Sequence, residues 1–296
     1  MNTLPLSSST ANAASTVRFL IPWDDETVRD ALATFARALG GEDAPVSLVQ
    51  IDASCHLAGS PSCAMHESKD LPSPDRDAMP ACANNIVETA ERGDADVILI
   101  GTSCRPDGEF DCTCLPAQIA LDSPVPVLLV RTSAIGQVFP PIIKRILVPF
   151  DGSPRAAHVL QFAARLAQQL ALPVHLVMVL DPKQILPPAF VFDPDAEDMV
   201  AGFREDAHFA LKQGELILDH ASVICHSTLL YGPVIGSLKG MIESGDLVMM
   251  TTHGLGNAPH GSLGSVAARM ISDIVDPLVI MRGIPAEDVV VQGRFA

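Results

Sequence analysis

One sequence pattern occurs twice along this chain of 296 residues. Residues 18–22 (Arg-Phe-Leu-Ile-Pro) precede Trp23-Asp24, and residues 145–149 (Arg-Ile-Leu-Val-Pro) precede Phe150-Asp151. Further pairs follow in the same order: Asp96 with Asp246, Gly101 with Thr251, Cys104 with Gly254, Pro126 with Pro277, and Arg131 with Arg282. A repeat of this extent predicts two similar units in tandem. The chain length suits two domains of roughly 150 residues.

Within each unit, apolar runs alternate with segments whose apolar residues have helical spacing. The expected strands are residues 17–22, 46–51, 97–100, 125–130, 145–149, 174–180, 223–230, 247–250 and 278–281. The expected helices are residues 28–39, 83–92, 115–121, 154–172, 199–220, 233–244 and 266–274. The interior runs are apolar throughout, which is typical of parallel strands covered on both faces. The pattern predicts an α/β fold made of two tandem domains, each a mostly parallel sheet flanked by helices.

The first unit is shorter than the second by about one helix and one strand. Residues 52–80 show no sustained period, and we interpret them as a loop or insertion. Residues 132–141 contain Thr, Ser, Gly and two prolines, which favours a junction there. We expect a disordered tail at residues 1–16, a first domain at 17–139 and a second domain at 140–296.

The net charge of −16 argues against a nucleic-acid partner, because such binding is dominated by clustered Lys and Arg. No apolar run approaches the roughly 18 to 20 residues of a membrane-spanning helix. Residues 1–16 have neither a basic region nor a long apolar core, so a signal peptide is not expected. These features predict a cytoplasmic protein without a membrane partner.

The stretch with the clearest chemical meaning follows the apolar run 247–250. It reads Thr251-Thr252-His253-Gly254, and after nine further residues Gly264-Ser265-Val266 opens a helix. Backbone N–H groups at a helix start lack internal partners and lie at the positive end of the helix dipole, so they can hold a phosphate. The alternative is a glycine-rich turn that only joins strand to helix.

These residues resemble the universal stress protein family, in its tandem two-domain form. The resemblance is carried by residues 146–153 (Ile-Leu-Val-Pro-Phe-Asp-Gly-Ser), residues 245–250, the glycine loop, and residues 277–280. It implies a Rossmann-like fold of the adenine nucleotide alpha hydrolase type, a stress-response role, and ATP or a related adenine nucleotide as ligand, with Mg as a candidate counter-ion. It also implies that the two halves pack as a pseudo-dimer through their last strands, with a homodimer as a further option.

The family signature is G-x2-G-x9-G-[ST], and this chain keeps its last two glycines and the serine. An acidic residue after the first strand meets the ribose, and Asp151 keeps that position. Its alternative role is to cap the following helix together with Ser153. The resemblance implies nucleotide contacts by the following residues: Pro149, Asp151, Val179, Met250, Thr251, Gly254, Gly264, Ser265 and Val266.

Thr251 departs from the signature because it replaces the first glycine. Its β-branched side chain would crowd a nucleotide or forbid a positive φ, which leaves a nucleotide-free stress protein or chaperone-like partner as the rival interpretation. In the first unit the equivalent run is Gly101-x2-Cys104-x9-Cys114, which lacks the Gly-Ser helix opening. We expect that unit to bind no nucleotide and to serve as a structural or regulatory partner.

Six of the seven cysteines lie in the first unit: Cys55, Cys63, Cys82, Cys104, Cys112 and Cys114. In a cytosolic chain these are expected to be thiols, with redox sensing or zinc binding as alternatives, the latter with His56 or His66 as a further ligand. No metal site is assigned. The common nucleophile-elbow, zinc-protease and P-loop motifs are absent from the sequence, so an enzyme is not predicted, with ATP hydrolysis kept as a rival.

Overall fold

The structure is a computed structural model, and it describes residues 16–51, 79–102, 115–131, 142–185, 196–254, 263–273 and 277–282. The first half contains β1 (Phe19–Trp23), α1 (Glu26–Gly40), β2 (Val46–Gln50), α3 (Met79–Arg92), β3 (Val97–Thr102), α4 (Leu115–Asp122) and β4 (Val127–Arg131). The second half contains β5 (Arg145–Pro149), α5 (Pro154–Leu170), β6 (Val174–Leu180), α6 (Pro182–Ile185), α7 (Ala196–His220), β7 (Cys225–Tyr231), α8 (Val234–Met241), β8 (Asp246–Thr251), α9 (Ser265–Asp273) and β9 (Leu278–Met281).

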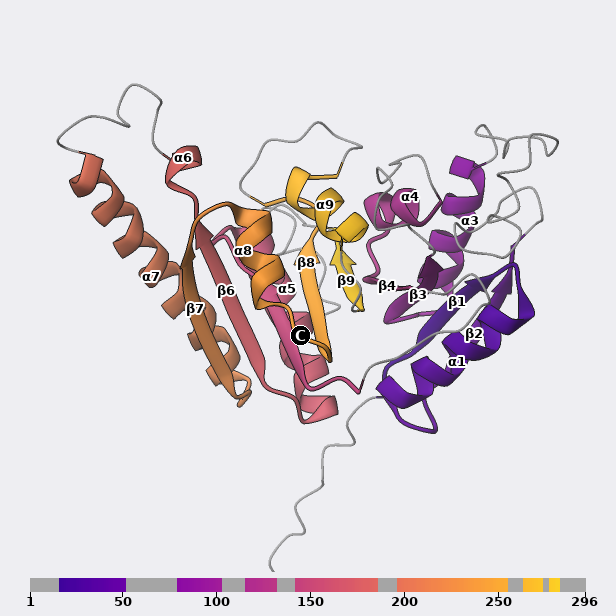
Figure 1. Ribbon diagram of the computed structural model, residues 1–296. Coiled ribbons are helices and arrows are strands. Elements are labelled where there is room, and N and C mark those ends of the chain that lie inside the picture. The colour runs from indigo at the N-terminus through magenta and orange to yellow at the C-terminus, as the bar shows by residue number, and fades with distance from the viewer. Residues whose placement is uncertain are drawn as a thin grey trace, which may run out of the picture.

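All nine strands of the described residues join one sheet in the order β2-β1-β3-β4-β9-β8-β5-β6-β7. The pairs within each half are parallel, and β4 with β9 is antiparallel. The α/β class and the mostly parallel sheet are therefore confirmed. Figure 1 shows the second half on the left and the first half on the right of this sheet.

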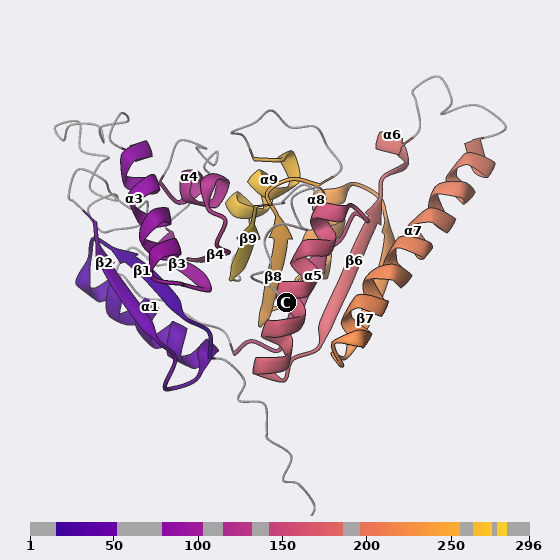
Figure 2. The same ribbon diagram turned by 180° about the vertical axis from the view of Figure 1, so that it is seen from behind.

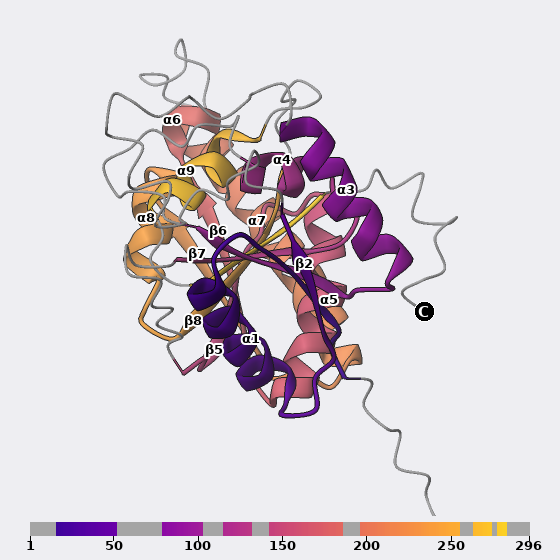
Figure 3. The same cartoon turned by 90° about the vertical axis from the view of Figure 1, so that its right-hand side faces the viewer.

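Helices cover both faces of the sheet, as Figures 1 and 2 show from opposite sides. One apolar core contains residues of α1, α5 and α7 together with alternate strand residues from both halves. The other core contains residues of α3, α4, α8 and α9 with the remaining strand residues. In Figure 3, which looks from the first half, α1 and α3 lie on opposite sides of β2. Each core thus crosses from one half to the other.

Local sequence signals explain the element boundaries. Ser153 caps α5 by accepting a hydrogen bond from the Ala156 N–H (3.0 Å), and Pro154 occupies the first helical position. The helix ends at Leu170 because Ala171 adopts the left-handed conformation (φ 52°), ahead of Pro173, where the sequence predicted the end. The short helix α6 lies between the expected strand 174–180 and the expected helix 199–220, where the sequence predicted no helix.

The shortfall of the first half is visible at its edge of the sheet. In the second half β6 is followed outward by β7, whereas the described residues place no strand outside β2. The predicted strands of residues 125–130 and 278–281 do pair with one another, through Val127 with Ile280 and Leu129 with Leu278. No helix among the described residues has the length and apolar character needed to cross a membrane. The division into domains at residue 139 stays a prediction.

Candidate functional site

The predicted site residues lie where the parallel strands β5, β6 and β8 end. β5 lies between β8 and β6 in the sheet. The chain leaves β5 toward β6 on one side and later returns to β8 on the other, so the order reverses between β5 and β8. Such a topological switch point is where α/β sheets form a ligand crevice, beyond the carboxyl ends of the strands. Asp151 follows β5, and Gly254 follows β8 by three residues.

Asp151 and Gly254 approach each other closely across this switch point. A Cβ atom added to Gly254 would lie 2.1 Å from Oδ2 of Asp151 and 3.2 Å from its Cγ. Only glycine leaves room for this carboxylate, which explains one glycine of the sequence signature. The other carboxylate oxygen, Oδ1, accepts a hydrogen bond from the Ser153 N–H (3.0 Å). Asp151 therefore both orders the start of α5 and faces the loop that follows β8.

Thr251 is the last residue of β8 and is only 8% exposed. Its hydroxyl donates to the carbonyl oxygen of His253 (2.7 Å). The non-glycine residues with positive φ in the described part of the chain are Asp94, Ala171 and Ser222, so Thr251 is not one of them. The conformational objection to a threonine at this position does not apply, because the strand geometry suits a β-branched residue.

Gly264 joins the start of α9 to the end of β8. Its N–H donates to the carbonyl oxygen of Thr252 (2.9 Å), and a Cβ added there would lie 3.0 Å from the same oxygen. Thr252 is buried, and its own N–H donates to the carbonyl oxygen of Met281 (2.8 Å). The first intrahelical bond of α9 runs from the Ala268 N–H to the Gly264 carbonyl oxygen (2.9 Å).

The N–H groups of residues 265–267 therefore stand at the open end of α9, where a helix lacks internal partners. The side chain of Ser265 is exposed, and that of Val266 is half-buried. The nine residues between Gly254 and Gly264 lie mostly outside the described residues. His253 is half-buried, and its Nδ1 lies 3.0 Å from the Thr252 hydroxyl oxygen.

Three predicted apolar contacts of the base lie on one face of the sheet. Pro149 is half-buried and pairs with Val177. Val179 packs at the margin of the core that contains α8 and α9, and Met250 belongs to that core. Val179 and Met250 lie on the strands that flank β5, so the end of β5 is bordered by an apolar side chain on each side.

Asp181 was not predicted as a site residue. It directly follows β6, is 9% exposed, and its Oδ1 accepts a hydrogen bond from the Lys183 N–H (3.0 Å). The available signal was an acidic residue immediately after an apolar strand, the same pattern that identified Asp151. The two carboxylates follow neighbouring strands at one edge of the sheet.

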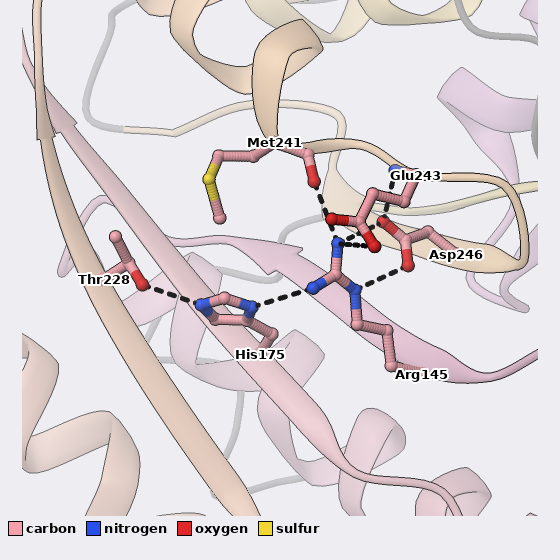
Figure 4. Close-up of polar contacts among 6 residues, drawn as sticks. All are labelled: Arg145, His175, Thr228, Met241, Glu243 and Asp246. Atoms are coloured by element: carbon pink, nitrogen blue, oxygen red, sulfur yellow. Dashed lines mark hydrogen bonds and ion pairs between the residues drawn. The ribbon is translucent and has the colours of Figure 1, made fainter.

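A second polar cluster lies at the opposite edge, where β5, β6 and β8 begin (Figure 4). Arg145 forms a two-pronged ion pair with Asp246 (Nε to Oδ1 2.6 Å, Nη2 to Oδ2 2.8 Å) and donates to the Met241 carbonyl oxygen (2.9 Å). Its Nη1 lies 3.4 Å from Nδ1 of His175, whose Nε2 lies 2.8 Å from the Thr228 hydroxyl oxygen. Sequence reasoning noted Arg145 and Asp246 only as repeated positions.

Most of the cysteines on which the redox and zinc hypotheses depend lie outside the described residues: Cys55, Cys63, Cys104, Cys112 and Cys114. Cys82 in α3 is disulfide-bonded, contrary to the expectation of free thiols. Cys225 is free, and burial raises the pKa of its thiol to about 11. Within the described ranges, no group of three or more His, Cys, Asp or Glu side chains could hold a metal ion.

The sheet order and the glycine-lined switch point define the class of protein, an α/β fold of the Rossmann-like type. Residues 143–282, in the second half of the chain, match the model of the Universal stress protein family.

The chain is similar to several solved structures, and the first of the following supports the fold. A universal stress protein from Archaeoglobus fulgidus is 16% identical, covers 90% of this chain and 96% of its own, and has a TM-score of 0.52. A functionally unknown protein from Pseudomonas aeruginosa is 14% identical over 91% of this chain and 83% of its own (TM-score 0.48). A universal stress protein in complex with cAMP is 15% identical over 48% of this chain and 99% of its own (TM-score 0.35). No curated protein matches the chain.

Proposed function

We propose that the second half of the chain binds ATP or a related adenine nucleotide, and that the protein acts as a binding and regulatory module of the stress response. The observation that carries the proposal is the convergence of three segments at the switch point. Gly254 approaches the Asp151 carboxylate, and Gly264 hydrogen-bonds to Thr252, which brings the open end of α9 to the end of β8. The family match over residues 143–282 supports the same conclusion.

The residues present fit an adenine nucleotide. The N–H groups that open α9, with the exposed Ser265 hydroxyl, supply donors for phosphate oxygens. A Cβ added to Gly264 would lie only 3.0 Å from the Thr252 carbonyl oxygen, so the close approach of the backbone forms this end of the site. Asp151 is the acceptor for ribose hydroxyls. Pro149, Val179 and Met250 border the base, and Mg²⁺ would enter as the counter-ion of the phosphates.

The rival interpretation, a nucleotide-free protein, depended on Thr251 obstructing the site. The Thr251 side chain is largely buried and its hydroxyl is bonded to the His253 carbonyl oxygen, so it supports the nucleotide proposal. For the first half we propose a structural or regulatory role, with the pairing of β4 and β9 as the contact of an intramolecular pseudo-dimer. We place the protein in the cytoplasm, with homodimer formation as a further proposal.

Titration calorimetry with Mg-ATP tests this function. We expect the wild-type protein to bind, and Gly264→Asp to lower the affinity by at least about tenfold, because a side chain would clash with the Thr252 carbonyl and place a like charge at the phosphates. Gly202→Asp is the matched control, since an added Cβ at this exposed position of α7 meets nothing within 4 Å. Wild-type protein that gives no heat at millimolar ATP would overturn the proposal.

A further inference from the structure

One side chain of the first half reaches the helix that carries the proposed phosphate site. Arg131, the last residue of β4, donates from Nη2 to the main-chain carbonyl oxygen of Ile271 in α9 (3.4 Å). The two residues are 140 positions apart in the chain. Arg131 is half-buried, so its charge is screened less than that of an exposed arginine.

The contact falls near the carboxyl end of α9, which spans Ser265–Asp273. The last carbonyl groups of a helix have no internal partner and lie at the negative end of its dipole. A guanidinium group there satisfies a carbonyl and stabilises the helix. The opposite end of α9 is the Gly264-Ser265 opening.

The pairing of the halves fixes where Arg131 lies. Leu129 pairs with Leu278 of β9, and two residues further along β4 the chain reaches Arg131. β9 in turn pairs in parallel with β8, and the Met281 carbonyl oxygen accepts from the Thr252 N–H. Ile271 and Leu129 belong to the same apolar core. Strand β4, which bears Arg131, is therefore adjacent to β9, and the Met281 carbonyl of β9 anchors the start of the glycine loop.

We propose that Arg131 is a positioning residue for nucleotide binding: the first half holds α9 at its carboxyl end and thereby fixes the phosphate-binding amino end. This inference rests on the proposed function. It assigns the first half a specific part in a site that it does not itself contain. The role of Arg131 is exerted through α9, so it concerns the phosphates and not the base.

The test compares ATP with adenosine, which lacks phosphates, in binding to wild-type protein, Arg131→Ala and Arg131→Lys. For Arg131→Ala we expect ATP affinity to fall by about two- to fivefold, the range of a charge at a helix end, with adenosine affinity unchanged. Arg131→Lys should recover most of the ATP affinity. Arg282→Ala is the control, since Arg282 is the exposed counterpart in the repeat.

Hydrogen exchange of the α9 amides in nucleotide-free protein gives an independent measurement. We expect faster exchange in Arg131→Ala and no change in Arg282→Ala. Unchanged ATP affinity in Arg131→Ala, an equal loss for ATP and adenosine, or unchanged exchange of α9 would each overturn the inference while the proposed function stands. Wild-type protein that binds no ATP would instead remove the proposed function, and the inference with it.

Discussion

At the scale of single residues, Arg145 shows how the repeat has diverged. In the first half the corresponding pair, Arg18 with Asp96, has side chains that are 46% and 23% exposed. In the second half Arg145 and Asp246 are 21% and 3% exposed. Removing one partner of a buried ion pair is strongly destabilising, because the other partner is left as an uncompensated buried charge. Asp246 also accepts from the Glu243 N–H (2.8 Å), so its two oxygens are both satisfied.

Arg145 also determines which ring nitrogen of His175 accepts a hydrogen bond. A guanidinium group can only donate, so the Nδ1 atom of His175 accepts and its Nε2–H donates to Thr228. The pKa of His175 is lowered by burial, and then by the positive charge of Arg145 and the neighbouring His226, against the opposing effect of Asp246 and Glu243. The folded protein therefore favours neutral His175.

We predict that this histidine makes the protein less stable in mild acid. The unfolded chain binds the proton more readily, so the free energy of unfolding should fall as pH drops below the ordinary histidine pKa of about 6.5. His175→Gln keeps an acceptor and a donor and should flatten the dependence between about pH 7 and pH 5. Urea unfolding at several pH values measures this. The control is His208→Gln, an exposed position of α7. An unchanged slope in His175→Gln would contradict the prediction.

At the scale of elements, the long helix α7 depends on one glycine for its close approach to the sheet. A Cβ added to Gly214 would lie 2.9 Å from Cδ1 of Leu176 and 3.3 Å from Cδ1 of Leu160, both of which are fully buried. Gly202 lies nearer the start of the same helix, and a Cβ added there would meet nothing within 4 Å. Helix α7 and β6 share an apolar core, so a side chain at Gly214 would separate them.

We predict that a side chain at Gly214 destabilises the protein, whereas a side chain at Gly202 is tolerated. Gly214→Val should lower the free energy of unfolding by about 2 kcal/mol, because an inserted side chain overpacks the core. Gly202→Val should change it by less than about 0.5 kcal/mol, as is usual for exposed positions. Denaturant titration followed by circular dichroism measures both. Equal effects would show that α7 does not pack on β6 at this distance.

At the scale of the whole molecule, the seam between β4 and β9 makes one sheet from two halves. Leu128 pairs with Val279 there, and both are 1% exposed. The two apolar cores each contain residues of both halves. Neither half can therefore lose its seam strand without exposing core residues of the other.

We predict that the chain unfolds as one cooperative unit and that the seam controls its stability. Val279→Asp should lower the free energy of unfolding by more than about 3 kcal/mol, because it buries an unpaired carboxylate. Leu48→Asp on the edge strand β2, where Leu48 is 49% exposed, is the matched control and should cost less than about 1 kcal/mol. Calorimetry measures both variants. Two separate transitions in the wild-type protein would contradict the prediction.

Local patterns predicted most of the elements. The apolar runs predicted strands that the structure confirms at Arg145–Pro149, Val174–Leu180 and Leu278–Met281. The helix start at Ser153-Pro154 is confirmed in α5. The helix α6 was missed because four residues among prolines show no period. The end of α5 was placed too late because Ala171, with its left-handed backbone, gives no composition signal.

The α/β class, the repeat, the shortened first half and the identity of the loop glycines could be predicted from the residues alone, because they follow from local spacing and from comparing the halves. The folded structure was needed to learn that Gly254 lies against Asp151, that Thr251 is buried, that Arg145 contacts His175, and that Arg131 reaches α9. Each of these depends on groups brought together from distant strands and loops by the sheet order, or on burial produced by the surrounding core. The neighbouring residues in the sequence encode neither this long-range proximity nor this burial.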